Sequence, residues 1–162
     1  MSEVLRSQSG AKTFPIESTP DNKHVAGFED QTIDVYKLIE LSKGLETQFV
    51  DLSRLESSVE EGNNYWHDSN GEWLGPAQII QEAAMFQGET KWSDLITRHP
   101  DWKDELLKIQ RADYKQFPII VIDNVVVDGI HRLTKAFIDG AEKIEIKHFA
   151  ELPKEIVVPN DV

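Results

Sequence analysis

The chain has 162 residues and no cysteine, so disulfides, thiolate metal ligands and cysteine nucleophiles are excluded. Its 29 acidic residues outnumber its 17 basic ones, and the formal net charge of −12 disfavours non-specific binding to nucleic-acid phosphates. No apolar run approaches the roughly 20 residues that span a bilayer, and the N-terminus lacks an apolar secretory segment, so we expect a cytoplasmic protein without membrane contact.

The length predicts a single domain. Residues 1–30 are polar with scattered apolar positions, which predicts a poorly ordered or extended arm. Within this arm, Phe14-Pro15-Ile16 and 25–28 are the segments expected to dock on the domain. The domain itself is assigned to 31–155, and 156–162 form a C-terminal tail.

The domain is predicted to open with a helix and a short strand. The helical pattern begins near Thr32, with Asp34 as N-cap and Gly44 as the left-handed residue that ends the helix. Alternation over 48–52 predicts a strand. The polar stretch 53–64 that follows is interpreted as a turn plus loop or a short helix.

Aromatic residues then stand in a very polar neighbourhood. Trp66 and His67 precede Asp68-Ser69-Asn70-Gly71, which is a strong turn signal. Two interpretations stay open for these aromatic side chains. They form the wall of a ligand site, or they close one end of the hydrophobic core.

Helical segments occupy the middle of the chain. The first begins at Gly75-Pro76, because proline is favoured in the first turn of a helix, and a short helical turn is expected at 92–96. A longer amphipathic helix begins at His99-Pro100. Its inward face consists of Trp102, Leu106 and Ile109.

Two apolar runs, 117–122 and 125–127, predict strands joined by Asp123-Asn124 in a tight hairpin. Their near-continuous apolar character predicts that both faces of the strands are covered. A helix at 130–138, ended by Gly140, and an alternating strand at 142–149 follow. We therefore predict an α+β fold, with a small mixed sheet flanked by helices.

The order strand, glycine turn, helix places an anion site at Asp128-Gly129-Ile130-His131-Arg132. Free backbone N–H groups and the positive end of the helix dipole converge at such a turn. His131 and Arg132 are side chains that bind phosphate or carboxylate. Structural alternatives remain open: an ion pair for Arg132, a brace of the turn for His131, and turn formation for Asp128. Thr134 and Lys135, one turn later, are expected on the solvated helix surface.

The sequence is similar to the ParB/sulfiredoxin superfamily. The residues that carry the likeness are Pro118-Ile119-Ile120-Val121, then Val126-Val127-Asp128-Gly129-Ile130-His131-Arg132-Leu133, with Ala136 and Gly140 beyond. They resemble the family's strand pair and its Gly-x-His-Arg motif at the start of a helix, in the Asp-Gly-x-His-Arg form of an uncharacterised ParB-like branch. The specific likeness covers about 35 residues, and a weaker likeness of layout covers about 110.

The resemblance implies a ParB/sulfiredoxin-like fold with a nucleotide at this turn, ATP or ADP as in the kinase and sulfiredoxin relatives or CTP as in ParB. It implies that Gly129 and Ile130 allow close backbone approach, that His131 and Arg132 contact phosphate, and that Asp128 orients the turn or assists Mg²⁺. Asp128 and His131 are the expected catalytic residues, and Trp66 and His67 the possible ligand wall.

Several features of this sequence differ from the family pattern, and these differences limit which of the family's functions we expect. Ile130 stands where sulfiredoxin needs its cysteine, so that reaction is excluded. The chain ends at Val162 without the ParB helix-turn-helix segment, so DNA binding on its own is not expected. The kinase branch uses an earlier glutamate, for which Glu56, Glu60 and Glu61 are candidates.

The resulting hypothesis is a nucleotide-binding domain that transfers or hydrolyses a nucleotide phosphate, with a small-molecule acceptor in the transfer case. The alternative is a non-catalytic module in which a nucleotide or another anion switches a protein contact. A nuclease is the third interpretation, weakened by the acidic composition. The five histidines show no metal-ligand spacing, so no protein-bound metal centre is expected.

Overall fold

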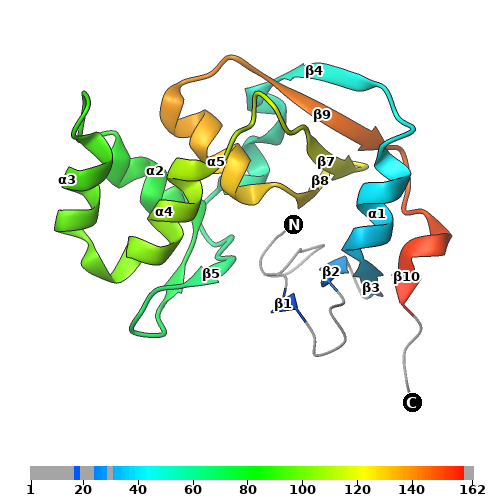
Figure 1. Ribbon diagram of the computed structural model, residues 1–162, viewed down its shortest axis with the longest axis horizontal. Helices are drawn as coiled ribbons and strands as arrows, with labels where there is room; N and C mark the ends of the chain where they lie inside the picture. The colour runs from blue at the N-terminus through cyan, green and yellow to red at the C-terminus, as the bar shows by residue number, and fades with distance from the viewer. Residues whose placement is uncertain (1–16, 19–23, 29–30, 159–162) are drawn as a thin grey trace.

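A four-stranded mixed sheet stands at the centre of the computed structural model, which describes residues 17–18, 24–28 and 31–158, with side chains for 31–158 (Figure 1). Its strand order is β4-β9-β7-β8, formed by Thr47–Asp51, Lys143–Phe149, Ile119–Ile122 and Val125–Asp128. β7 and β9 run parallel, and the other neighbours run antiparallel. The predicted α+β class with a small mixed sheet is confirmed.

The predicted hairpin at Asp123-Asn124 joins β7 to β8, with Ile122 opposite Val125. Asp123 adopts a φ of 55°, a left-handed conformation that aspartate tolerates better than most residues. Its N–H donates to the Phe149 carbonyl at 2.7 Å, and this bond ties the hairpin to the end of β9.

Both faces of β7 are covered, as its apolar run predicts. Ile119 and Val121 pack into the first of three hydrophobic clusters, beneath α5 (Ile130–Asp139). Ile120 and Ile122 pack into the third cluster, beneath α1 (Val35–Ser42). All four β7 residues are buried. Side chains alternate across a strand, so one short segment contributes to two cores.

Asp34 caps α1 as predicted, although the helical pattern does not extend back to Thr32, and the end of the helix at Gly44 differs from the prediction. Residues Gln31–Asp34 form strand β3, and the helix begins only at Val35, where the Asp34 carboxylate accepts from the Lys37 N–H at 3.1 Å. Gly44 does not take the left-handed conformation predicted for it. The helix ends instead in a tighter turn, in which Lys43 and Gly44 donate to the carbonyls three residues earlier.

A helical layer packs beside α5, on one side of the sheet (Figure 1). It contains α2 (Pro76–Ala83), α3 (Lys91–Arg98), the 3₁₀ turn η2 (Pro100–Trp102) and α4 (Lys103–Arg111). The segment predicted as a short turn at 92–96 is thus a complete helix, and α4 starts later than His99. The second hydrophobic cluster lies here, with Ile79, Leu95, Leu106 and Ile109 fully buried.

The aromatic segment forms a small hairpin of β5 (Trp66–His67) and β6 (Trp73–Leu74). The predicted turn at 68–71 is present, with the Gly71 N–H donating to the Asp68 carbonyl at 3.0 Å. The Asn70 amide donates to the Asp101 carboxylate at 2.8 Å, which fixes the hairpin against η2.

Segments from the two ends of the chain form a second sheet in the order β1-β2-β3-β10. β1 (Glu17–Ser18) and β2 (His24–Phe28) precede β3, and β10 (Val157–Val158) follows the 3₁₀ turn η3 (Lys154–Ile156). Phe14-Pro15-Ile16 and 159–162 lie outside the described residues. The polar stretch after β4 forms the 3₁₀ helix η1 (Leu52–Val59), and among the described helices none is long and apolar enough to cross a bilayer.

Candidate functional site

A cavity of about 760 Å³ opens where β8 passes into α5. Its walls come from α1, the residues around β5, α4 and the loop that follows α4, and the start of α5. It brings together the residues predicted for the turn and for the ligand wall: Trp66, His67, Asp128, Gly129, Ile130, His131 and Arg132. The described structure thus places residues that are more than 60 positions apart in one site.

The turn at Gly129 determines how α5 faces the cavity. Gly129 has a φ of 110°, which residues with a side chain rarely adopt, and no side chain caps the helix it precedes. A Cβ at this position would lie 3.0 Å from both the Arg132 Nη2 and the Ile119 Cγ1 atoms. Glycine is therefore required here for its conformation and for space. Among residues 31–158, no side chain provides a capping partner for the first N–H groups of α5, as an anion site needs.

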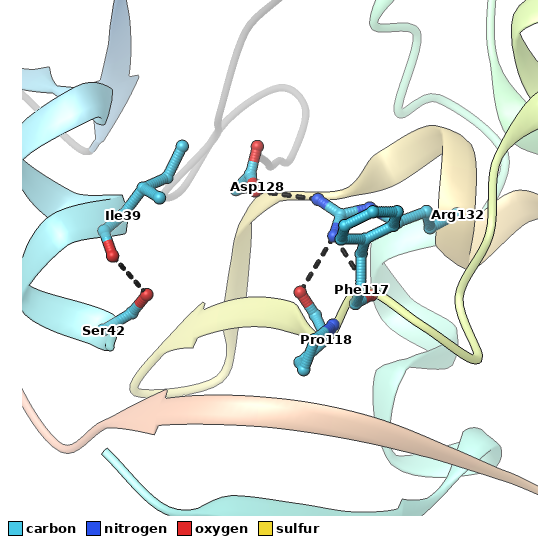
Figure 2. A network of polar contacts seen from close by, with 6 residues as sticks. All are labelled: Ile39, Ser42, Phe117, Pro118, Asp128 and Arg132. Atoms are coloured by element: carbon cyan, nitrogen blue, oxygen red, sulfur yellow. Dashed lines mark hydrogen bonds and ion pairs between the residues drawn. The ribbon is translucent and has the colours of Figure 1, made fainter. Parts of the chain in front are cut away.

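Arg132 holds the turn in place (Figure 2). Its Nη1 atom donates to the carbonyls of Phe117 and Pro118 at 3.0 and 2.9 Å, and its Nη2 atom donates to the Asp128 carboxylate at 2.7 Å. The arginine and aspartate side chains are only 18% and 20% exposed. The ion pair that was the structural alternative for Arg132 is thus present, with Asp128 as the partner. Arg132 lines the cavity, and because a guanidinium carries five N–H donors, it keeps donors beyond those used in these three bonds.

His131 is held between a carboxylate and an aromatic ring. Its Nε2 atom lies 2.8 Å from the Glu105 Oε1 atom, and its ring stacks on Trp66 at a centroid distance of 4.7 Å. Burial raises the pKa of Glu105, but the hydrogen bond and charge of His131, with Lys108, outweigh burial and lower the pKa overall. Glu105 therefore stays ionised at neutral pH.

Two cations of α4 stand at the same cavity. Lys108 is 60% exposed and lies 3.7 Å from the Glu105 Oε2 atom. Within residues 31–158, the Arg111 guanidinium makes no hydrogen bond or ion pair. The two residues are three positions apart and share one helix face, so they provide local positive charge in an otherwise acidic chain.

Thr134 and Lys135 do not lie on a solvated surface as predicted. Thr134 is fully buried, and its hydroxyl donates to the Ile130 carbonyl at 2.7 Å. Lys135 donates to the Gln110 and Ala112 carbonyls at the end of α4, at 2.7 and 3.0 Å. The prediction failed because α4 packs against this face of α5, which the local pattern of α5 does not reveal.

The two interpretations of the aromatic segment are compatible. Tyr65 and Trp66 are 2% and 7% exposed and belong to the second cluster, so they do close the core. Both also line the cavity, together with the exposed His67, whose ring lies 4.0 Å from that of Trp73.

Sequence reasoning missed Glu105 and favoured the wrong acidic segment. Glu56, Glu60 and Glu61 are exposed and do not line the cavity. Glu105 lies in the first turn of α4, where an acidic residue is favourable whether or not it has a partner. Its one sequence signal is its position next to the inward-facing Leu106, and that signal does not specify a partner.

The arrangement combines an uncapped helix start for an anion, cations that balance its charge, and a carboxylate–imidazole pair for proton transfer. In the part of the chain that the structure describes, no three His, Asp or Glu side chains converge as a metal cage. A Mg²⁺ ion held chiefly by phosphate oxygens needs only one or two carboxylates, so Asp128 fits that smaller role. No protein family model, curated protein or solved structure matches this chain.

Proposed function

We propose that the chain is a ParB/sulfiredoxin-like domain that binds a nucleotide in this cavity and transfers or hydrolyses its terminal phosphate. The observation that carries the proposal is the uncapped start of α5, which opens into a cavity of about 760 Å³. Small-molecule and cofactor sites occupy about 300–1,000 Å³ and combine apolar walls with a few placed polar groups. The size and lining of this cavity support a ligand as large as a nucleotide.

The phosphates would be bound at the first amides of α5, where Gly129 leaves the backbone accessible. Lys108 and Arg111 would balance their charge, which the net charge of −12 otherwise repels. A nucleotide would carry Mg²⁺ on its phosphates, with Asp128 contributing a carboxylate oxygen. The base would pack on the aromatic side chains of the cavity, which include Tyr65, Trp66 and Phe117.

The alternative function is a non-catalytic module in which a bound nucleotide or anion switches a protein contact. This alternative is supported by the origin of the cavity walls. They come from separate segments of the chain, namely α1, the β5 region, α4 and α5. A ligand that touches all of them would change how they are held together. A nuclease or an independent DNA-binding protein is less well supported, because few cations are available to meet a polyanion.

Calorimetry with ATP, ADP, CTP and GTP, each with Mg²⁺, tests nucleotide binding. We expect one nucleotide to bind, and we expect Lys108→Ala and Arg111→Ala each to weaken it by at least about 1 kcal/mol, because each removes a charged hydrogen bond. Lys103→Ala is the matched control, since it removes an exposed lysine of α4 outside the cavity. Binding of none of the four nucleotides contradicts the proposal.

Arg132→Ala separates phosphate contact from bracing. We expect it to weaken nucleotide binding by about 1.5–3 kcal/mol and also to lower the free energy of unfolding, because three charged hydrogen bonds are lost. Urea denaturation and calorimetry on the same variant measure the two effects. An unchanged affinity, measured where the variant is fully folded, would leave Arg132 with its bracing role alone.

A further inference from the structure

His131 is fixed in one orientation at the edge of the cavity. Its backbone lies in the first turn of α5, one ring face stacks on Trp66 with an interplanar angle of 14°, and its Nε2 atom is bonded to Glu105. The Glu105 side chain is 14% exposed, so solvent competes weakly for that hydrogen bond. A histidine that only supported the turn would not need to be held on three sides.

The hydrogen bond also determines which nitrogen carries the proton in the neutral ring. An ionised carboxylate can only accept hydrogen bonds, so the His131 Nε2 atom must be the donor to Glu105. The Nδ1 atom is then left with a free lone pair. No residue among 31–158 bonds to Nδ1, and the ring borders the cavity.

We propose that Glu105 and His131 form a proton-accepting dyad, in which Nδ1 of His131 takes the proton of a hydroxyl group or water bound beside the nucleotide. The inference rests on the proposed function, since it needs a nucleoside triphosphate in the cavity. His131 is the catalytic residue, and Glu105 is a positioning residue that sets the tautomer and stabilises the imidazolium.

The proposed step is a phosphoryl transfer in which each bond that breaks is matched by a bond that forms. The acceptor O–H bond breaks and its proton moves to Nδ1, while the acceptor oxygen forms a bond to the terminal phosphorus. The bond between that phosphorus and the bridging oxygen breaks, and the nucleoside diphosphate leaves with the electron pair. The imidazolium then releases its proton to solvent. With water as acceptor the product is inorganic phosphate.

The chain contains a matched control pair outside the cavity. Glu82 and His99 are bonded through the same atom types at 2.6 Å, and the His99 ring stacks on Trp102 at 3.8 Å. Neither Glu82 nor His99 lines the cavity. A change at this pair removes the same kind of carboxylate–imidazole hydrogen bond, but it cannot reach a ligand bound in the cavity.

The test combines side-chain NMR of the full chain with turnover. Two-bond ¹H–¹⁵N spectra, with His131 assigned through His131→Gln, are expected to show the Nε2–H tautomer in the free protein. Phosphate release from the bound triphosphate, in water and with glycerol as added acceptor, should fall about 10²- to 10⁴-fold in His131→Gln. We expect Glu105→Gln to lower it at least about tenfold, with nucleotide Kd changed less than about twofold. Glu82→Gln should leave turnover unchanged.

The outcomes distinguish this inference from the function on which it rests. Absence of nucleotide binding to the wild type overturns the proposed function before turnover is measured. Binding without any phosphate release overturns the dyad together with the transfer or hydrolysis step, and leaves nucleotide binding standing. The dyad is also overturned by an Nδ1–H tautomer in the wild type, or by equal turnover in Glu105→Gln and Glu82→Gln.

Discussion

At the junction of β8 and α5, a single arginine joins three stretches of chain. Arg132 donates to a carboxylate four residues earlier and to two carbonyls of the loop before β7. Charged donors paired with carbonyl and carboxylate oxygens form stronger bonds than neutral donors, and the planar guanidinium can make all of them at once. At the scale of one residue, the side chain expected to bind the ligand also builds the site that would hold it.

Tyr114 provides a residue-scale prediction on pH dependence. Its hydroxyl donates to the Asp139 carboxylate at 2.9 Å, and burial together with Asp139 raises its pKa from 10.0 to about 12. Between pH 10 and 12 the unfolded chain releases this proton before the folded chain does, so stability falls as pH rises.

We expect Tyr114→Phe to lower the free energy of unfolding by about 1 kcal/mol at pH 7, because it removes the hydrogen bond. The difference between wild type and variant should shrink from pH 10 to 12, since the variant has no proton to lose there. Urea denaturation at pH 7, 10 and 11 measures it. A difference that stays constant across this range would show that the Tyr114 pKa is not raised by folding.

At the scale of elements, β8, Gly129 and α5 act as one unit. The strand brings Asp128 to the cavity, the left-handed glycine reverses the chain, and the helix starts without a side-chain cap. A glycine at the N-cap loses only about a few tenths of a kcal/mol relative to a Ser, Thr, Asp or Asn cap. Here that loss leaves N–H groups available to a ligand.

Substitution of glycine tests how strongly this unit depends on its turn. Gly129→Ala should lower the free energy of unfolding by about 2–3 kcal/mol, because left-handed strain adds to crowding against Arg132 and Ile119. Gly140→Ala is the matched control: it has a φ of 71°, but nothing lies within 4 Å of the added Cβ, so only about 1 kcal/mol of strain is expected. Thermal or urea denaturation compares the two. Equal losses would show that the close approach at Gly129 relaxes without cost.

At the scale of the molecule, three hydrophobic clusters surround the cavity, and the third joins the two ends of the described chain. It contains Ile33 of β3, Ile122 of β7 and Ile156 of η3, all fully buried. β10 pairs with β3 directly after η3. Val127, which lines the cavity, belongs to the same cluster, so the packing of the ends supports the site from behind.

A substitution at Ile156 measures how much the packing between the two ends of the described chain contributes to stability. Ile156→Ala should lower the free energy of unfolding by about 2–4 kcal/mol, because it leaves a void in a fully buried cluster. Glu155→Ala, an exposed neighbour, should change it by less than about 0.5 kcal/mol. A loss at Ile156 no larger than that at Glu155 would mean that the C-terminal segment does not contribute to the core.

What the sequence by itself determined is local. The apolar runs around Asp123-Asn124, the helix after Gly129 and its end at Gly140 were all predictable, because side-chain alternation and left-handed turns depend on neighbouring residues. The aromatic residues in a polar loop suggested a ligand wall at Trp66, but no local pattern indicated that Trp66 would meet the 128–132 turn. Asp34 caps α1 as predicted, but β3 occupies the residues before the helix, and a 3₁₀ turn replaces the left-handed end predicted at Gly44.

Only the tertiary structure decided which partner each polar side chain finds. Glu105 meets His131 across 26 positions, Lys135 meets the end of α4, and the Arg132 guanidinium binds backbone carbonyls as well as facing the cavity. Whether Thr134 is buried depended on α4 packing against α5. These contacts follow from how helices and strands pack, and packing sums many weak interactions between residues far apart in sequence, which no local pattern records.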